Sequence, residues 1–276
     1  MWFDKFARFG YVTKGFVYCL LSFLAAEIAI AEDEQVAQVG KVSTSGALEA
    51  IAIQPFGRLL LSVVAIGLMS YALWRFLQAA LDPRHSQRKP LEKIFVRLGY
   101  ILSGLSYAGL SISATEMILR VKQGNNNSPS DWTAQLLELP FGRWLVGILG
   151  LAIIVVGFSY FRHAFKAKSD LHLDLPAMRE TIGVWIIGLG RLGIATRGIV
   201  FGLVGFFLLQ AALKFDPQEA KGLDGILHSL AQQKLGKSML VIIAFGLFTY
   251  SIYMFVEARF RQMKPLEVLT QDFKRL

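Results

Sequence analysis

Long apolar runs alternate with short polar linkers along the whole chain. Six runs approach or exceed the length needed to cross a bilayer, at residues 11–31, 57–80, 98–119, 142–165, 192–214 and 237–260. A helix that rises about 1.5 Å per residue needs roughly 20 apolar residues to cross the hydrocarbon core. The pattern therefore predicts an all-α integral membrane protein with six transmembrane helices.

The first, third and fifth runs open on one repeated frame. This frame is an arginine, any residue, a glycine, four residues of any kind and a second glycine, with an aromatic residue three positions later. It starts at Arg8, Arg97 and Arg191, and the even runs align without gaps on Gly57, Gly142 and Gly236. The chain is therefore predicted to hold three tandem helical-hairpin repeats of two spans each, over residues 1–83, 84–169 and 170–276, the last with a cytoplasmic tail.

A shorter amphipathic segment precedes each even run. These segments cover residues 47–54, 132–139 and 226–233, with Ser45, Ser130 and Asp224 as candidate N-caps. Each has only about two helical turns and is too short to span a bilayer. We therefore expect three interfacial helices at the outer membrane surface.

Composition and charge support a membrane location. Of the 276 residues, 54% are hydrophobic and only 18% are charged, whereas a soluble domain averages about 25% charged residues. The net charge of +9 comes from basic residues at the ends of apolar runs, so we expect no nucleic-acid partner. Most basic residues fall on one side of the predicted membrane and the acidic residues 32–34 on the other. The positive-inside rule then places both termini in the cytoplasm.

The first apolar run also has features of a signal peptide. Lys5, Arg8 and Lys14 lead into it, and it ends on Ala29-Ile30-Ala31, which resembles a cleavage site. The same segment recurs twice inside the chain, where it cannot act as a signal. This recurrence favours a retained first span.

The chain resembles a bacterial membrane family known as domain of unknown function 1206. The residues that carry the resemblance are the three repeated openings and the segments 54–58, 67–75 and 257–261. The resemblance implies three paired-helix units in the bacterial plasma (inner) membrane and supplies no activity. The third repeat lacks the Pro-Phe-Gly-Arg tetrad and the second lacks the Tyr71–Trp74 pair, so we do not expect a purely symmetric function.

Three polar residues end equivalent stripes on the even spans. They are Gln78, His163 and Glu257, and Tyr250 and Tyr253 share the stripe of the last span. Around a pseudo-threefold axis these residues would converge near the cytoplasmic side and could handle a proton or a small cation. The alternative is that they lie at headgroup level, where polar tips and aromatic belts are ordinary.

Two basic residues lie one to two turns inside the predicted inner boundary. Lys14 and Arg197 occupy equivalent positions in the first and third repeats. Snorkelling would bring both charges to phosphate level, where they could bind anionic lipid headgroups of the inner leaflet. Arg197, like Arg191, is also a candidate ion-pair partner for Glu257.

Two acidic residues lie nineteen positions after an opening arginine, close to the outer boundary. They are Glu27 and Glu116, and the next span begins at the same depth with Arg58 and Arg143, respectively. The pattern predicts the ion pairs Glu27–Arg58 and Glu116–Arg143, each stabilising one hairpin.

Catalytic and cofactor motifs are missing from the sequence. It has no phosphate-binding glycine loop, no Gly-x-Ser-x-Gly and no HExxH, and its four histidines and single Cys19 lack metal-ligand spacing. We expect no enzyme activity, no cofactor and no metal. The expected function is that of a structural, lipid-binding or partner-binding membrane protein. Its expected partners are membrane lipid, including anionic lipid, and a membrane protein or second copy. The alternative is a small ion, proton or solute channel or transporter that uses the even-span stripe.

Overall fold

The computed structural model describes residues 2–30, 43–81, 90–119, 129–166, 180–231 and 236–260. All regular elements in these ranges are helical. The long helices are α1 (Trp2–Ile30), α3 (Gly57–Leu81), α4 (Pro90–Leu119), α6 (Gly142–Lys166), α7 (Glu180–Lys214) and α9 (Gly236–Phe260). The short ones are α2 (Thr44–Ala52), α5 (Pro129–Leu137), the 3₁₀ helix η3 (Pro217–Glu219) and α8 (Leu223–Ala231).

Some predictions fall outside the described residues. The repeat boundaries near 83–84 and 169–170 are among them, as are the acidic residues 32–34 and most of the basic linkers on which the predicted orientation depends. The orientation of the chain in a membrane therefore stays a prediction.

Five of the long helices are long and apolar enough to cross a membrane. These segments are Lys5–Ile30, Gly57–Ala80, Gly142–Phe165, Ile187–Lys214 and Gly236–Phe260. The remaining long helix, α4, is diluted by several serines and Glu116. The all-helical membrane architecture is thus confirmed in outline, whereas the count of six spans stays a prediction.

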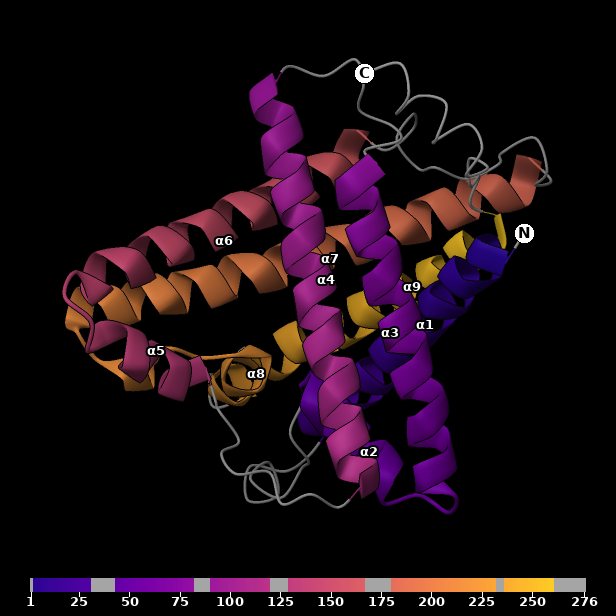
Figure 1. Cartoon of the computed structure of the whole chain (residues 1–276), viewed down its shortest axis with the longest axis horizontal. Helices are drawn as coiled ribbons and strands as arrows, with labels where there is room; N and C mark the ends of the chain where they lie inside the picture. The colour runs from indigo at the N-terminus through magenta and orange to yellow at the C-terminus, as the bar shows by residue number, and fades with distance from the viewer. Residues whose placement is uncertain are drawn as a thin grey trace.

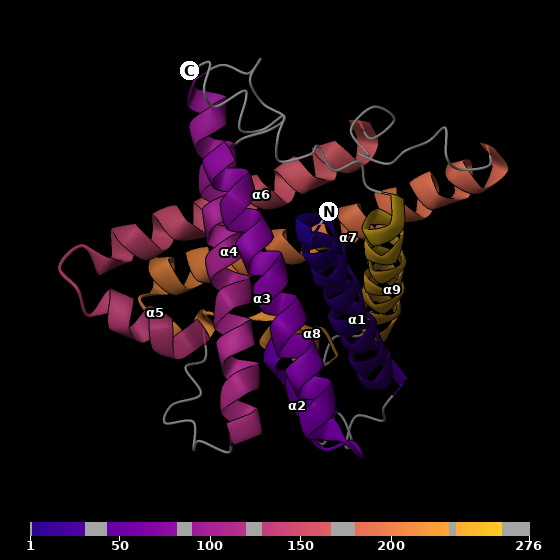
Figure 2. The same ribbon diagram turned by 45° about the vertical axis from the view of Figure 1, so that its right-hand side comes forward.

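The long helices pair mainly across repeat boundaries. Helix α3 packs along α4, α6 along α7, and α9 along α1, and the α6–α7 pair crosses the α3–α4 pair steeply (Figures 1 and 2). Within repeats, α1 packs on α3 and α7 packs on α9, but α4 and α6 are not packed along each other. The neighbours therefore follow one another as α4, α3, α1, α9, α7 and α6, which is an open series rather than a closed ring. The hairpin predicted for the second repeat is not found.

Interlocking small residues allow the two long helices of the first repeat, and those of the third, to pack closely against each other. A Cβ on Gly67 would lie 1.8 Å from Oγ1 of Thr13, and a Cβ on Gly246 would lie 1.9 Å from Oγ1 of Thr196. Threonine on one helix therefore fills the space left by glycine on the other, as close packing of helices in lipid requires.

The second repeat lacks this interlock. The positions equivalent to Thr13 and Gly67 hold Leu102 and Ala152, which add a bulky side chain and a Cβ where close approach is needed. Nothing lies within 4 Å of a Cβ built on Gly99, the first glycine of this repeat's opening frame. The departure of α4 from α6 therefore has a local cause in the sequence.

The second glycine of each opening frame faces a different neighbour. Gly15 lies against Phe255 of α9, Gly104 against Phe76 of α3, and Gly198 against the backbone of Gly157 of α6. In each case the contacted helix is the even helix of another repeat. In the first and third repeats, the frame therefore joins its helix to two partners, with the first glycine facing the even helix of its own repeat and the second facing the even helix of another repeat. In the second repeat only the second glycine, Gly104, makes such a contact.

The corners between α2 and α3 and between α5 and α6 contain a phenylalanine with a left-handed backbone conformation, followed by glycine. Phe56 and Phe141 have φ angles of 62° and 71°. A Cβ on Gly57 would come within 2.4 Å of a carbonyl oxygen of α2, and one on Gly142 within 1.9 Å of a carbonyl oxygen of α5. These glycines let each short helix turn directly into the next long helix. The side chain of Ser43, not the predicted Ser45, caps α2 by accepting from Gly46 N.

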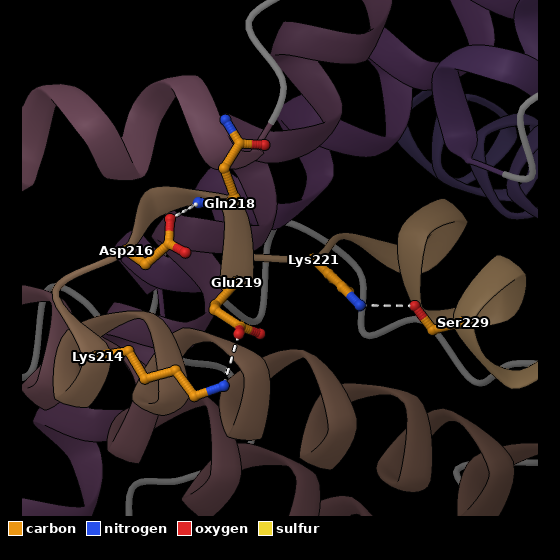
Figure 3. A network of polar contacts seen from close by, with 6 residues as sticks. All are labelled: Lys214, Asp216, Gln218, Glu219, Lys221 and Ser229. Carbon is orange, nitrogen blue, oxygen red and sulfur yellow. Dashed lines mark hydrogen bonds and ion pairs between the residues drawn. The ribbon is translucent and has the colours of Figure 1, made fainter.

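Polar contacts hold the outer connection of the third repeat (Figure 3). Lys214 Nζ lies 2.6 Å from Oε1 of Glu219, and Asp216 caps η3. Lys221 Nζ donates to Ser229 Oγ over 2.8 Å, which ties the connection to α8. This segment anchors the end of α7 to the short helix that precedes α9.

The first glycines of the three frames give a matched test of this packing. Gly10→Ala would place a Cβ 2.7 Å from the backbone nitrogen of Tyr71, and Gly193→Ala would place one 2.5 Å from that of Tyr250. Each change should lower the free energy of unfolding in detergent by about 1–3 kcal/mol, because neither backbone can yield cheaply.

Gly99→Ala is the control, because it meets nothing. It should leave stability unchanged or raise it by about 1 kcal/mol, since alanine favours the helix. Equal losses of stability in all three variants would contradict the absence of close packing around Gly99.

Candidate functional site

Three cationic side chains meet where the long helices cross. They are Lys14 from α1, Arg75 from α3 and Arg197 from α7, and Lys14 and Arg197 are only 1% and 8% exposed. We call these cations and the aromatic side chains around them the cation–tyrosine cluster. Its aromatic members are Tyr18, Tyr71, Tyr100, Tyr107, Tyr160, Phe201 and Tyr250.

Two equivalent hydrogen bonds hold the cluster in the first and third repeats. Lys14 Nζ donates to Tyr71 Oη over 2.9 Å, and Arg197 Nη1 donates to Tyr250 Oη. Each bond joins the odd helix of a repeat to its even helix, beside the interlocked threonine and glycine. The polar contact and the small-residue contact therefore close the same interface.

The second repeat cannot make the third bond of this kind. Its equivalent positions are Ser103 and Val156, so both the cation and the phenol are missing. The cluster consequently has two cation–phenol pairs where three repeats would allow three.

Arg75 adds a third positive charge next to Tyr71. Its guanidinium donates to Tyr71 Oη, with Nε at 2.8 Å, and its Nη1 donates to Oε1 of Gln78 over 3.1 Å. Tyr71 Oη therefore accepts hydrogen bonds from both Lys14 and Arg75. Because both lone pairs of the phenol are engaged, its own proton is left to donate to another acceptor.

Aromatic rings from all six long helices surround the cations. The Lys14 ammonium lies between 4.7 and 5.9 Å from four tyrosine ring centroids, and the Arg197 guanidinium between 5.1 and 5.5 Å from four aromatic rings. Tyr107 brings α4 to the cluster, and Tyr160 brings α6. Cation–π contacts of this kind contribute about 0.5–2 kcal/mol each.

The charges of the two arginines are not balanced by acids in the described part of the chain. Arg75 and Arg197 interact there with phenols, an amide and rings, and neither forms an ion pair with a carboxylate. Nε of Arg197 is buried without a hydrogen-bond partner. Buried cations and orphaned donors cost free energy in an apolar interior. The arrangement is therefore suited to an anion that accepts hydrogen bonds.

Comparison with known protein families shows to which family the chain belongs. The family called Domain of Unknown Function (DUF1206) matches residues 9–82, 98–167 and 192–261. These matches cover most of the chain and coincide with the three repeats. The chain belongs to the DUF1206 family.

Two further proteins are similar to this DUF1206 protein. The uncharacterized protein YxxB of Bacillus subtilis (strain 168) is 32% identical over 265 residues, covering 95% of this chain and 92% of YxxB. The probable glucose uptake protein GlcU of Staphylococcus epidermidis is 25% identical over 146 residues, covering 52% of this chain and 42% of that protein. No solved structure matches the chain.

The even-span residues of this DUF1206 protein do not lie as one group around an axis of even helices. Gln78 and Glu257 are buried, whereas His163 is exposed, and α3, α6 and α9 are not packed along one another. Gln78 instead orients Arg75. Tyr250 belongs to the cation–tyrosine cluster, and the ring centroid of Tyr253 lies 6.3 Å from that of Tyr250.

Lys14 and Arg197, which were predicted to reach lipid headgroups, lie inside the helix bundle. Both side chains are buried and point at phenol oxygens of the same repeat. Tyr71 and Tyr250 supply the acceptors for these two cations, so neither side chain extends along its helix to an exposed position. Arg197 accordingly makes its bond to Tyr250 and not to Glu257.

The predicted outer ion pairs are wrong. Arg143 donates from Nε to Ala212 O over 3.0 Å and from Nη2 to Leu213 O over 3.2 Å, so it caps the end of α7. Glu116 cannot reach it in the same way, because α4 and α6 are not packed together. Glu27 and Arg58 are both exposed and form no ion pair with each other.

The spacing of Tyr71 and Arg75 is a signal that could have located the cluster. These residues lie four apart, so they share one helix face, and that face also carries Gln78. The contributions of Tyr18, Tyr107 and Tyr160 could not be predicted, because they depend on which helices pair across repeats. No group of three or more His, Cys, Asp or Glu in the described ranges could hold a metal ion.

The hydroxyls of Tyr71 and Tyr250 should contribute more to the stability of the protein than the hydroxyl of the neighbouring Tyr18. Tyr71→Phe removes the acceptor shared by Lys14 and Arg75, and Tyr250→Phe removes the acceptor of Arg197. Each substitution should lower the free energy of unfolding in detergent by roughly 1.5–3 kcal/mol, because a charged donor loses its partner in a buried site.

Tyr18→Phe serves as the control in the same unfolding experiment. Its ring lies near Lys14 and Arg197, but its hydroxyl makes no hydrogen bond within the described ranges. This variant should stay within about 0.5 kcal/mol of wild type. A loss as large as that of Tyr71→Phe would mean that the hydrogen bonds are not what stabilises the cluster.

Proposed function

We propose that this DUF1206 protein binds an anionic, phosphate-like group at the cation–tyrosine cluster, within its membrane-embedded part. The observation that carries the proposal is the buried guanidinium of Arg197, whose Nε has no hydrogen-bond partner. Arg75 adds a second guanidinium with no carboxylate in ion-pair contact among the described residues. An anion supplies the acceptor and the charge together.

The donors in the cluster match this kind of ligand. A guanidinium presents planar, paired N–H groups that fit phosphate or carboxylate oxygens. Tyr71 and Tyr250 accept bonds from the cations, and each keeps a hydroxyl proton to donate. The rings around the cations limit access of water, which strengthens each electrostatic contact.

A binding role fits these residues better than catalysis. The cluster consists of cations, phenols and aromatic rings. Of the two candidate acid–base residues on the even spans, Glu257 is buried and His163 is exposed. We therefore propose no enzyme activity. The proposed location is the bacterial inner membrane with both termini in the cytoplasm, because the basic residues concentrate in the linkers of one side.

Binding is also favoured over solute transport. The similarity to a probable glucose uptake protein covers 42% of that protein at 25% identity. A sugar carries no charge, and three convergent cations are not the chemistry that recognises it. The convergent charges instead favour an anionic ligand.

Arg197→Gln should weaken anion binding. The substitution removes the charge and the unpartnered donor, so affinity for phosphatidylglycerol or for inorganic phosphate should fall roughly tenfold or more. Native mass spectrometry of retained lipid and thermal stabilisation by added phosphate measure the two ligand sources separately. Arg197→Lys keeps the charge and should lie between Arg197→Gln and wild type.

Arg143→Gln is the matched control, because it removes one arginine that is exposed and bonded to helix-end carbonyls. It should bind as wild type does. A wild-type protein that prefers neither anionic over zwitterionic lipid nor phosphate over buffer would contradict the proposed function.

A further inference from the structure

The space between α4 and α6 is an unclosed interface, which we call the second-repeat seam. The Thr–Gly interlock of the other repeats is replaced there by Leu102 and Ala152. No described residue lies within 4 Å of a Cβ built on Gly99, whereas a Cβ built on the equivalent glycines of the other repeats would lie 2.7 Å or less from backbone atoms. Only 17% of the apolar window of α6 is buried within the protein.

This seam borders the cation–tyrosine cluster. Tyr107 of α4 lies over Lys14, with 5.4 Å from ammonium to ring centroid, and Tyr160 of α6 lies over Arg197, with 5.1 Å from guanidinium to ring centroid. In the first and third repeats, a phenol on the even helix bonds to a cation on the odd helix. In the second repeat, Val156 stands at the phenol position and is 43% exposed. The second repeat therefore contributes neither a cation nor a phenol of this kind beside the cluster.

The two helices that flank the seam are exposed and apolar. On α4, the exposed large hydrophobic residues include Ile101, Leu102 and Leu105, and α6 exposes a comparable series along its length. Water-soluble anions gain nothing from such a surface, whereas acyl chains bury apolar area on it. The chemistry of the flanks differs from that of the cluster, so a matching ligand must be both anionic and apolar.

Taking the proposed anion binding as given, we propose that the ligand is an anionic membrane lipid that enters sideways through the second-repeat seam. Its acyl part lies between α4 and α6, and its phosphate accepts bonds from Arg197 and Arg75. Arg75 lies five residues before the end of its apolar segment at Ala80, which is about 8 Å along the helix. A lipid headgroup needs a lateral route to reach that depth, and the space between α4 and α6, which are not packed along each other, is the route that we propose.

The divergence of the repeats suggests how to close the seam. Leu102→Thr with Ala152→Gly recreates the interlock that Thr13–Gly67 and Thr196–Gly246 make in the other repeats. Gly99→Phe is an independent second variant that adds a bulky side chain at the first glycine of this repeat's frame, where a Cβ meets no described neighbour within 4 Å. Leu59→Thr, at an exposed position of α3, is the control for loss of an exposed leucine.

The experiment uses the full chain in nanodiscs of phosphatidylglycerol and phosphatidylcholine. Retained phosphatidylglycerol is counted by native mass spectrometry, and inorganic phosphate is tested separately by thermal stabilisation. Wild type and Leu59→Thr should retain phosphatidylglycerol in preference to phosphatidylcholine. The closed and filled variants should stay folded and lose that preference roughly tenfold, with the cluster arginines unchanged.

Each other result overturns the inference in a distinct way. If the closed and filled variants retain phosphatidylglycerol as wild type does, the lipid does not use the seam. If phosphate stabilises all variants equally and no lipid is preferred, the ligand is a free anion and the proposed function stands without the lipid. If wild type binds neither ligand, the proposed function itself fails. A dimer that becomes a monomer on closure would make the seam an interface between two copies.

Should Leu102→Thr with Ala152→Gly fail to fold, Gly99→Phe decides the question alone. Its Cβ meets no described neighbour within 4 Å and the position is exposed, so folding should survive. Retained lipid in this folded variant overturns the inference, and lost lipid supports it.

Discussion

Burying a guanidinium among apolar helices is the constraint on which the rest of the structure depends. Arg197 and Arg75 have no carboxylate in ion-pair contact within the described ranges, so phenols, an amide and aromatic rings must offset their desolvation. Those partners come from six different helices. The cluster therefore ties together spans from all three repeats, and it explains why tyrosine recurs on the faces that meet at the crossing. The same charge imbalance is the reason for proposing an anion as the ligand.

The threefold repeat of the sequence explains why the opening frame occurs three times, and the differences between the repeats explain why the second one packs differently. In the first and third repeats the opening frame joins one helix to two neighbours, an arrangement that three equal copies could close into a ring. The second copy has lost the threonine, the glycine, the cation and the phenol that close the other two. One interface consequently stays open beside the cations. Loss of these residues in one repeat thus converts a symmetric packing scheme into an open series of helices.

The sequence alone predicts the helical membrane architecture, the three repeats and the family, because apolar run length and repeated glycines are local signals. It also singles out Lys14 and Arg197 as unusual charges within spans. It does not predict where those charges point, because Tyr71 and Tyr250 become their partners only through helix packing. The ion pair expected between Glu116 and Arg143 fails for the same reason. Although α4 and α6 are consecutive long helices, they do not pack along each other, because Leu102 and Ala152 stand where the other repeats have the interlocking threonine and glycine.

The most direct test of this account is a structure of the full chain determined in a phosphatidylglycerol nanodisc. We predict phosphate density within hydrogen-bond distance of Arg197 Nε, with acyl density between α4 and α6. A structure in which α4 packs along α6, with the cluster closed and no lipid beside Arg197, would contradict it.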